Sequence, residues 1–278
     1  MNYTLAEWLN LITRWAHVFA SILWVGQTYF FTWLDGRFSE EEQQVRQNLD
    51  ATGSGPEPPK VWMVHSGGFY VIEKQKLGRQ VPPKLRWFKW EAAITWLSGL
   101  VLLILVYYTG GLMVEASSTT SAGRAIGIGV VVLIVGWVVY DGVWASPLGR
   151  SETTATVILY GLVVLVSYGL CQIMSGRAAY MHVGGLFGTI MAANVWMRIL
   201  PAQRRMIQAV AEGRAPDERL AVQAKLRSKH NTFMVVPVVF IMVSNHFPVA
   251  TYGNRYNWLI LSLLIVAGWG AAAHLRRA

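Results

Sequence analysis

The chain has 278 residues, of which 54% are hydrophobic and 14% charged, and its mean hydropathy is +0.36. This composition is typical of a protein that crosses a membrane several times, and it excludes an ordinary soluble enzyme. The net charge of +9 does not indicate a nucleic-acid partner, because the basic residues lie in the segments that flank the apolar stretches. Cys171 is the single cysteine, so we expect neither a disulfide nor a Cys-x-x-Cys-His haem attachment.

Seven apolar stretches are long enough to cross a bilayer as helices. They are Trp8–Trp33, Ala92–Val114, Ala125–Trp144, Thr153–Met174, Ala178–Leu200, Asn231–Phe247 and Tyr256–His274. Residues 1–278 are therefore expected to form one all-α integral membrane domain, a bundle of seven transmembrane helices. The sixth stretch is short, and Pro237 within it is expected to kink its helix, because proline removes a backbone donor.

Lysine and arginine are concentrated in two of the connecting segments. Residues 35–91 hold nine of them and residues 198–230 hold eight. Because basic residues favour the cytoplasmic side of a membrane, both segments are expected to be cytoplasmic loops. This orientation places the N-terminus outside and the C-terminus in the cytoplasm.

The first of these loops is expected to contain secondary structure of its own. Val61–Val64 and Phe69–Ile72 are β-prone runs around a Gly-containing turn, which predicts a β-hairpin. The pattern Ser39-x-x-Glu42 is typical of a capping box and predicts a separate surface helix near Ser39–Leu49. His65, at the hairpin turn, either helps to bind a planar anionic substrate and to transfer protons, or only docks the hairpin.

Three histidines, His17, His182 and His246, lie in the outer half of the predicted bundle. Polar side chains inside a membrane are rare and commonly functional, and neutral imidazole is a good axial ligand for haem iron. We therefore expect these residues to bind haem b, with the ligating pair left open; the alternative is that each is hydrogen-bonded between helices. Gly184 and Gly188, on one face of the fifth stretch, either make room for the cofactor or allow close helix packing.

A second group of polar residues lies toward the cytoplasmic side. His230 and Asn231, at the inner end of the sixth stretch, are expected to share a substrate site with His65. Asp141, near the inner end of the third stretch, is expected to anchor at the interface or to pair with an arginine. The sequence contains no Walker, Rossmann, serine-hydrolase or zinc-finger motif.

One run of sequence resembles a known family. Lys229–Pro248, with His-Asn-Thr-Phe-x-x-x-Pro-Val-x-Phe-x-Met-x-Ser-Asn-His-Phe-Pro, is similar to the transmembrane domain of the membrane-bound, cytochrome-linked urate oxidases, also called urate hydroxylases. The motifs His17-x-x-x-Ser21-x-x-Trp24-x-Gly26, His65-x-Gly-Gly-Phe-Tyr70 and Tyr256-Asn257-Trp258 fit the same domain. The resemblance covers nearly the whole chain.

This resemblance implies a multi-pass protein of the bacterial inner membrane that oxidises urate to 5-hydroxyisourate. Electrons would leave through bound haem to a cytochrome c. Family members of this type continue into a further span and a cytochrome c domain, whereas this sequence ends at Ala278. We therefore expect a separate c-type cytochrome as partner. The alternative is a non-catalytic accessory subunit of a larger respiratory or photosynthetic complex, and a transporter is disfavoured because no inverted repeat is evident.

Overall fold

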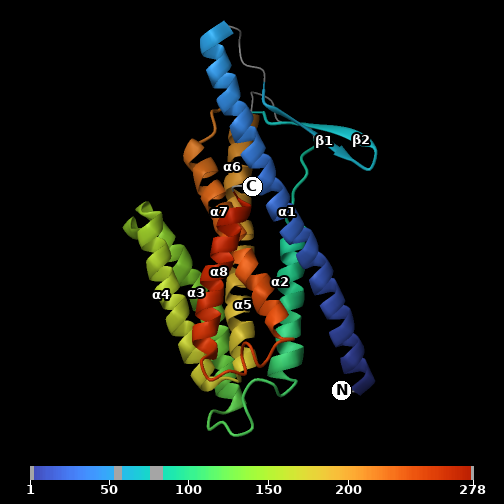
Figure 1. Ribbon diagram of the computed structural model, residues 1–278, viewed down its shortest axis with the longest axis vertical. Coiled ribbons are helices and arrows are strands. Elements are labelled where there is room, and N and C mark those ends of the chain that lie inside the picture. The colour runs from blue at the N-terminus through green and yellow to red at the C-terminus, as the bar shows by residue number, and fades with distance from the viewer. Residues whose placement is uncertain (1–2, 53–57, 76–83, 277–278) are drawn as a thin grey trace.

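The computed structural model describes residues 3–52, 58–75 and 84–276. Within these residues, long helices form a bundle and one β-hairpin projects from its side (Figure 1). The elements are α1 (Tyr3–Thr52), β1 (Lys60–His65), β2 (Gly68–Glu73), α2 (Trp90–Leu102), α3 (Ala122–Ala145), α4 (Glu152–Ile173), α5 (Gly176–Ala193), α6 (Leu200–Ala211), α7 (Glu218–Ser244) and α8 (Asn257–Leu275).

Two helices contain π-helical stretches that join neighbouring segments. α2 continues through Leu103–Tyr108, so that one helix runs from Trp90 to Tyr108. α5 continues through Asn194–Ile199 into α6, so that one helix of 36 residues runs from Gly176 to Ala211. The described residues therefore contain seven long helices, and each of the seven predicted stretches overlaps one of them. The second stretch was predicted too long, because its helix ends at Tyr108 rather than at Val114.

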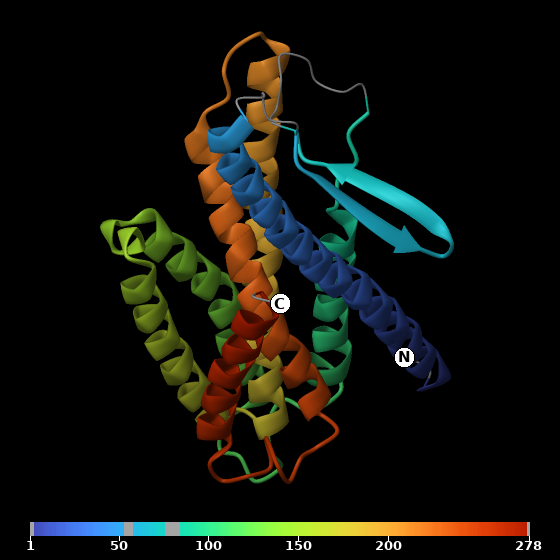
Figure 2. The ribbon, with the colours of Figure 1, turned by 45° about the horizontal axis from the view of Figure 1, so that its top comes forward.

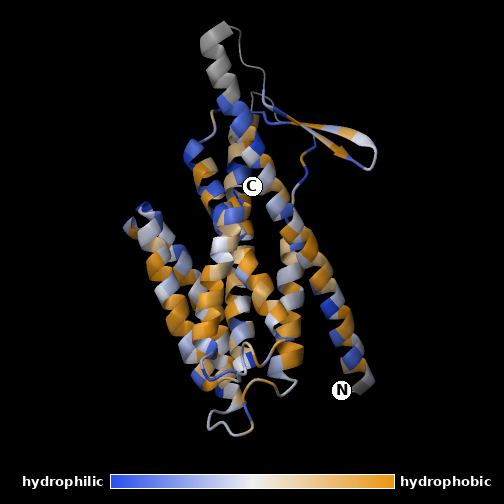
Figure 3. Ribbon diagram, viewed as in Figure 1, coloured by the Kyte–Doolittle hydropathy of each residue, from blue (hydrophilic) through white to orange (hydrophobic). Residues whose placement is uncertain are grey.

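Five of these helices, in the part of the chain that is described, are long and apolar enough to cross a membrane. They are the α2 helix to Tyr108, α3, α4, the joined α5–α6 helix and α8. Hydrophobic residues dominate the lower part of the bundle in Figure 3, whereas hydrophilic residues gather toward its upper end. The arrangement is consistent with a membrane protein. The first and sixth predicted stretches lie in the helices α1 and α7, but neither of these helices is as apolar as the five named above.

Serine side chains cap the N-termini of α3, α4 and α5. Ser121 accepts a hydrogen bond from the backbone N–H of Arg124 at the start of α3, and Ser151 accepts one from Thr154 at the start of α4. Ser175 caps α5 in the same way. Such side chains satisfy N–H groups that have no partner within the helix. The short connections make α4 antiparallel to both α3 and α5, so α3 and α5 run in the same direction.

α5 lies at the centre of the bundle (Figure 2). In its joined helix, 56% of the most apolar stretch is buried, against at most 28% in the other four membrane-length helices. A Cβ atom added to Gly184 would lie 3.0 Å from Cγ2 of Ile241, so this glycine allows α7 to approach closely. Gly268 of α8 lies similarly close to Pro237, which α7 accommodates without interruption. Close packing therefore accounts for Gly184.

α1 is one uninterrupted helix, and the prediction of a separate surface helix at Ser39–Leu49 is wrong. Ser39 does not cap a helix there, because its hydroxyl donates a hydrogen bond to the carbonyl of Asp35 inside the same helix. Leu34 and Phe38 of this extended helix pack against Val61 at the base of the hairpin. These contacts hold the hairpin against α1.

The predicted hairpin is confirmed. β1 and β2 pair antiparallel, with His65 opposite Gly68 and a two-residue turn at Ser66 and Gly67. Both turn residues have positive φ angles, 50° and 77°, as a type I′ turn requires. One face of the hairpin carries Trp62 and Phe69, which are 72% and 77% exposed.

Candidate functional site

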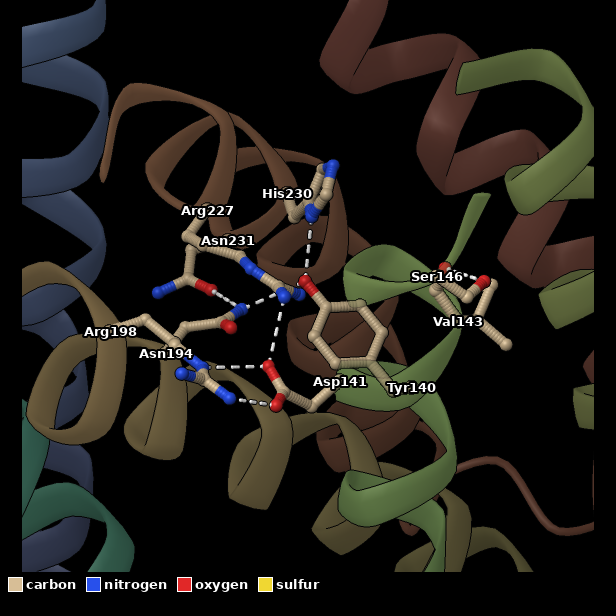
Figure 4. Close-up of polar contacts among 9 residues, drawn as sticks. All are labelled: Tyr140, Asp141, Val143, Ser146, Asn194, Arg198, Arg227, His230 and Asn231. Carbon is tan, nitrogen blue, oxygen red and sulfur yellow. Dashed lines mark hydrogen bonds and ion pairs between the residues drawn. The ribbon is translucent and has the colours of Figure 1, made fainter. Parts of the chain in front are cut away.

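A buried carboxylate joins three helices near the C-terminal end of α3 (Figure 4). Asp141 is 7% exposed, and Arg198, from the π-helical stretch after α5, pairs with both of its oxygens. Arg227 of α7 donates to Oδ1 of Asp141 at 2.8 Å and is itself 7% exposed. Two guanidinium groups thus share one carboxylate, and only that of Arg227 is buried, because the Arg198 side chain is 47% exposed.

A chain of amide and phenol groups lies beside this ion pair. Nδ2 of Asn194 donates to the hydroxyl oxygen of Tyr140 at 3.0 Å and to Oδ1 of Asn231 at 3.0 Å. Asn231 in turn donates to the backbone carbonyl of Met191 at 3.0 Å. Both ends of the Asn231 amide are therefore engaged, and this residue fixes the orientation of Asn194.

His230 completes the group through its contact with Tyr140. The hydroxyl oxygen of Tyr140 lies 2.6 Å from Nδ1 of His230. Because that oxygen already accepts from Asn194, donation of its own hydrogen to Nδ1 gives both the Tyr140 hydroxyl hydrogen and Nδ1 a partner. On this assignment Nε2 of a neutral His230 carries a hydrogen. Figure 4 shows the second ring nitrogen pointing away from Tyr140, and the Trp144 ring lies 4.2 Å from the imidazole.

Two polar atoms of this group have no partner among the described residues. They are Nη1 of Arg227, a donor, and Oδ1 of Asn194, an acceptor. An unsatisfied buried polar group costs about 1–3 kcal/mol, so such atoms commonly mark a place where a ligand or a water binds. A free donor and a free acceptor in one cluster suit a ligand that presents both kinds of group.

The structure brings together two of the three residues predicted for the substrate site. His230 and Asn231 are neighbours in the cluster, whereas His65 lies exposed at the turn of the hairpin. Asp141 pairs with arginines, one of the two roles expected for it. Sequence reasoning did not single out Asn194, although an amide within an apolar stretch is a signal of the same kind as an intramembrane histidine.

His182 is fully buried and has partners at both ring nitrogens. Nδ1 lies 2.7 Å from the carbonyl oxygen of Ala178, and Nε2 lies 3.2 Å from the hydroxyl of Tyr108. A Cβ atom added to Gly129 would lie 2.5 Å from Nε2, so this edge of the ring is pressed against the backbone of α3. The space at Nε2 does not fit the face of a porphyrin.

His17 and His246 lie in other surroundings. Nδ1 of His17, in the seam between α1 and α2, lies 2.9 Å from the carbonyl oxygen of Thr95 and 3.1 Å from Oγ of Ser98. Ser98 and Tyr108 are ten residues apart, so His17 and His182 contact the α2 helix at levels about 15 Å apart. His246 is exposed beyond the end of α7.

The three histidines predicted to ligate haem therefore do not converge in this structure. Among the residues described, no group of three or more His, Cys, Asp or Glu side chains is arranged to hold a metal ion. Haem b stays a prediction, with no ligating pair assigned.

Comparison with known proteins places the chain in a family. Residues 3–276 match the family described as Urate oxidase N-terminal. Neither a curated protein nor a solved structure matches the chain. The match covers both the polar cluster and the β-hairpin, and the chain belongs to the urate oxidase N-terminal family.

Proposed function

We propose that this protein is an inner-membrane oxidoreductase that converts urate to 5-hydroxyisourate at the cluster around Asp141 and His230. The family match over residues 3–276 carries the proposal of urate as substrate. The chemistry of the cluster supports it. Urate is a planar anion whose edges carry N–H groups beside carbonyl oxygens. The cluster offers excess positive charge, a free donor on Arg227 and a free acceptor on Asn194.

The reaction requires a proton acceptor and an electron acceptor. Urate and one water give 5-hydroxyisourate, two protons and two electrons. Arg198 and Arg227 would hold the anion, and Asn231 would orient Asn194. Tyr140 and His230 form a hydrogen-bonded pair through which a proton can leave the site. The electrons would pass to a separate c-type cytochrome.

The proposed setting is the bacterial inner membrane, with seven spans, an outer N-terminus and a cytoplasmic C-terminus. The polar cluster then lies toward the cytoplasm, where the loops at 35–91 and 198–230 carry most of the basic residues. His65 would approach the site from the hairpin. Haem b, held by His17 or His246, would supply one-electron chemistry to the electron path.

Equilibrium binding of urate to the purified protein tests the substrate proposal. Arg227→Gln removes a buried charge and a free donor, so it is expected to weaken binding by about tenfold or more. Arg198→Gln, at a partly exposed position, is a second variant that perturbs folding less. Arg214→Gln is the matched control, because Arg214 pairs with Glu212 on the surface. Equal binding by all three variants and the wild type would exclude the cluster as the urate site.

A non-catalytic accessory subunit is the second candidate, and the hairpin favours it. Trp62, Val64 and Phe69 are each at least 69% exposed, on a face that no other part of the described chain covers. Large exposed apolar patches commonly mark sites of protein or membrane contact. The protein can be purified in mild detergent and tested for both partners and urate binding. If it remains part of a larger complex and binds no urate, the result would support the accessory-subunit role rather than the enzyme role.

A further inference from the structure

An apolar cleft of about 500 Å³ lies between α3 and α4 on one side and α5, α7 and Trp269 of α8 on the other. In Figures 1 and 2, the α3–α4 pair diverges from α7 and α8 toward the upper end of the bundle. Most of the side chains that line the cleft are apolar. The charged side chains and His230 lie at one end, where the cleft meets Tyr140, Trp144, Glu152, Lys229 and His230.

The shape of the cleft fits one extended hydrocarbon chain. On α3 the lining extends from Val131 to Trp144, and on the antiparallel α4 it extends from Val166 to Glu152. These spans of 14 and 15 residues rise by about 20 Å. The cleft is therefore long, with a polar end and an apolar tail.

The polar end presents one oriented donor. Nδ1 of His230 is held by the hydroxyl of Tyr140, so Nε2–H is the hydrogen available to a ligand in the cleft. The Trp144 ring, 4.2 Å from the imidazole, adds a flat surface beside it. A carbonyl oxygen on a planar ring would accept from His230 and lie against this aromatic wall.

The charges at this end disfavour a phosphate group. Lys229 and Glu152 form an ion pair at 2.6 Å across the end of the cleft, from α7 to α4. Their charges cancel, so no unpaired cation of the lining is available to an anionic headgroup.

We propose that this cleft binds a lipid-soluble quinone, with one ring carbonyl accepting a hydrogen bond from Nε2 of His230 and the isoprenoid tail lying between α3 and α4. Binding of the quinone does not depend on the proposed urate reaction; its role as electron acceptor rests on that reaction. In that role one quinone, in place of the separate cytochrome, takes the two electrons and two protons released by one urate and becomes a quinol. The Tyr140–His230 pair lies on the path that a proton would follow from the cluster to the quinone oxygen.

Photolabelling of the intact, detergent-purified protein with an azido-ubiquinone analogue tests the site, with decylubiquinone as competitor. Labelled peptides are expected from the cleft-facing parts of α3, α4 or α7, and decylubiquinone should suppress the labelling in a saturable way. Leu159→Trp places an indole in the cleft and should weaken binding by about tenfold or more. Leu165→Trp, on the same helix at a residue that is 66% exposed and outside the lining, should leave it unchanged.

His230→Phe keeps a ring of similar shape but removes the donor, so its affinity for decylubiquinone should fall about tenfold. Labelling that is insensitive to both Leu159→Trp and His230→Phe would overturn the proposal. Displacement by phosphatidylglycerol as effective as that by decylubiquinone would also overturn it, because the cleft would then be a general lipid site.

Photolabelling, combined with an assay of urate oxidation, separates the quinone site from the proposed function. Site-specific quinone binding without urate-dependent quinol formation would support the site and contradict its redox role. Urate oxidation with cytochrome c, but without labelling in the cleft, would overturn the quinone site and leave the enzyme function intact.

Discussion

The hydroxyl oxygen of Tyr140 lies 2.6 Å from Nδ1 of His230, and this contact links α3 to α7 between two regions of different chemistry. On one side of it lies the polar cluster of Asp141, Arg198, Arg227 and Asn194. On the other side, the imidazole lines the apolar cleft. The pair is therefore placed to transfer a proton from the polar cluster to a molecule bound in the cleft. The same contact fixes the orientation of the His230 ring.

Tyr140→Phe should impair urate turnover more than urate binding. The variant removes the hydrogen bond that fixes the tautomer of His230, and it leaves Asn194 with one acceptor fewer. We expect kcat to fall about tenfold with little change in KM, because the lost contact concerns proton transfer rather than anion binding. The loss of stability should be about 1–3 kcal/mol.

Tyr160→Phe is the matched control for this variant. The hydroxyl of Tyr160 donates to the carbonyl of Ser262, which joins α4 to α8 outside the polar cluster. Its removal should cost about 0.5–1.5 kcal/mol and leave kcat unchanged. A similar fall in kcat for both variants would show that the effect of Tyr140→Phe is a general loss of packing.

Asp141→Asn should destabilise the protein strongly. Removal of the carboxylate leaves Arg227, which is almost fully buried, without its counter-ion, and breaking a buried pair costs about 3–5 kcal/mol. The free energy of unfolding can be followed by denaturant titration in detergent micelles. Glu40→Gln, which breaks a surface pair with Arg37, should change it by less than about 0.5 kcal/mol. A difference of less than 1 kcal/mol between the two would contradict the ion-pair account.

Gly129→Ala should displace His182. The new methyl group would lie 2.5 Å from Nε2 of His182, so the imidazole must move and its bond with Tyr108 must lengthen. We expect a loss of about 1–3 kcal/mol. Gly127→Ala, on the same helix but with no atom within 4 Å of the added methyl, should be neutral or slightly stabilising. Equal midpoint temperatures of thermal unfolding for the two variants would contradict the close contact between α3 and His182.

A pyridine haemochrome assay and a reduced-minus-oxidised spectrum test the prediction of haem b. A b-type signal near one haem per chain is the expected result. Loss of this signal in His17→Ala or His246→Ala would identify a ligand. Full retention in these two variants and in His182→Ala would remove all three histidines from the haem proposal.

The sequence predicted the helices well where hydropathy and capping agree. The stretch Ala125–Trp144 corresponds to α3, which Ser121 caps, and the β-prone runs around Ser66 and Gly67 form the hairpin. The capping-box pattern at Ser39 misled the prediction, because serine inside a helix also bonds to the carbonyl four residues earlier. A local pattern could not distinguish these two roles.

The site was less predictable because it depends on which helix faces point inward. Counting residues from a span's end placed His17, His182 and His246 in one half of the bundle, but their rings face different neighbours. His230 and Asn231 were found from their position at the end of an apolar stretch. Their contacts with Tyr140 and Asn194 join residues 90 and 37 positions apart, and no local pattern in the sequence encodes such pairings.

Turnover of urate by the purified protein in liposomes tests the central claim most directly. The assay follows the loss of urate absorbance together with the reduction of added cytochrome c or decylubiquinone. The account predicts urate consumption with two electrons delivered per urate, and a large loss of this activity in Arg227→Gln but not in Arg214→Gln. A folded preparation that consumes no urate with either acceptor would contradict the account and favour the accessory-subunit role.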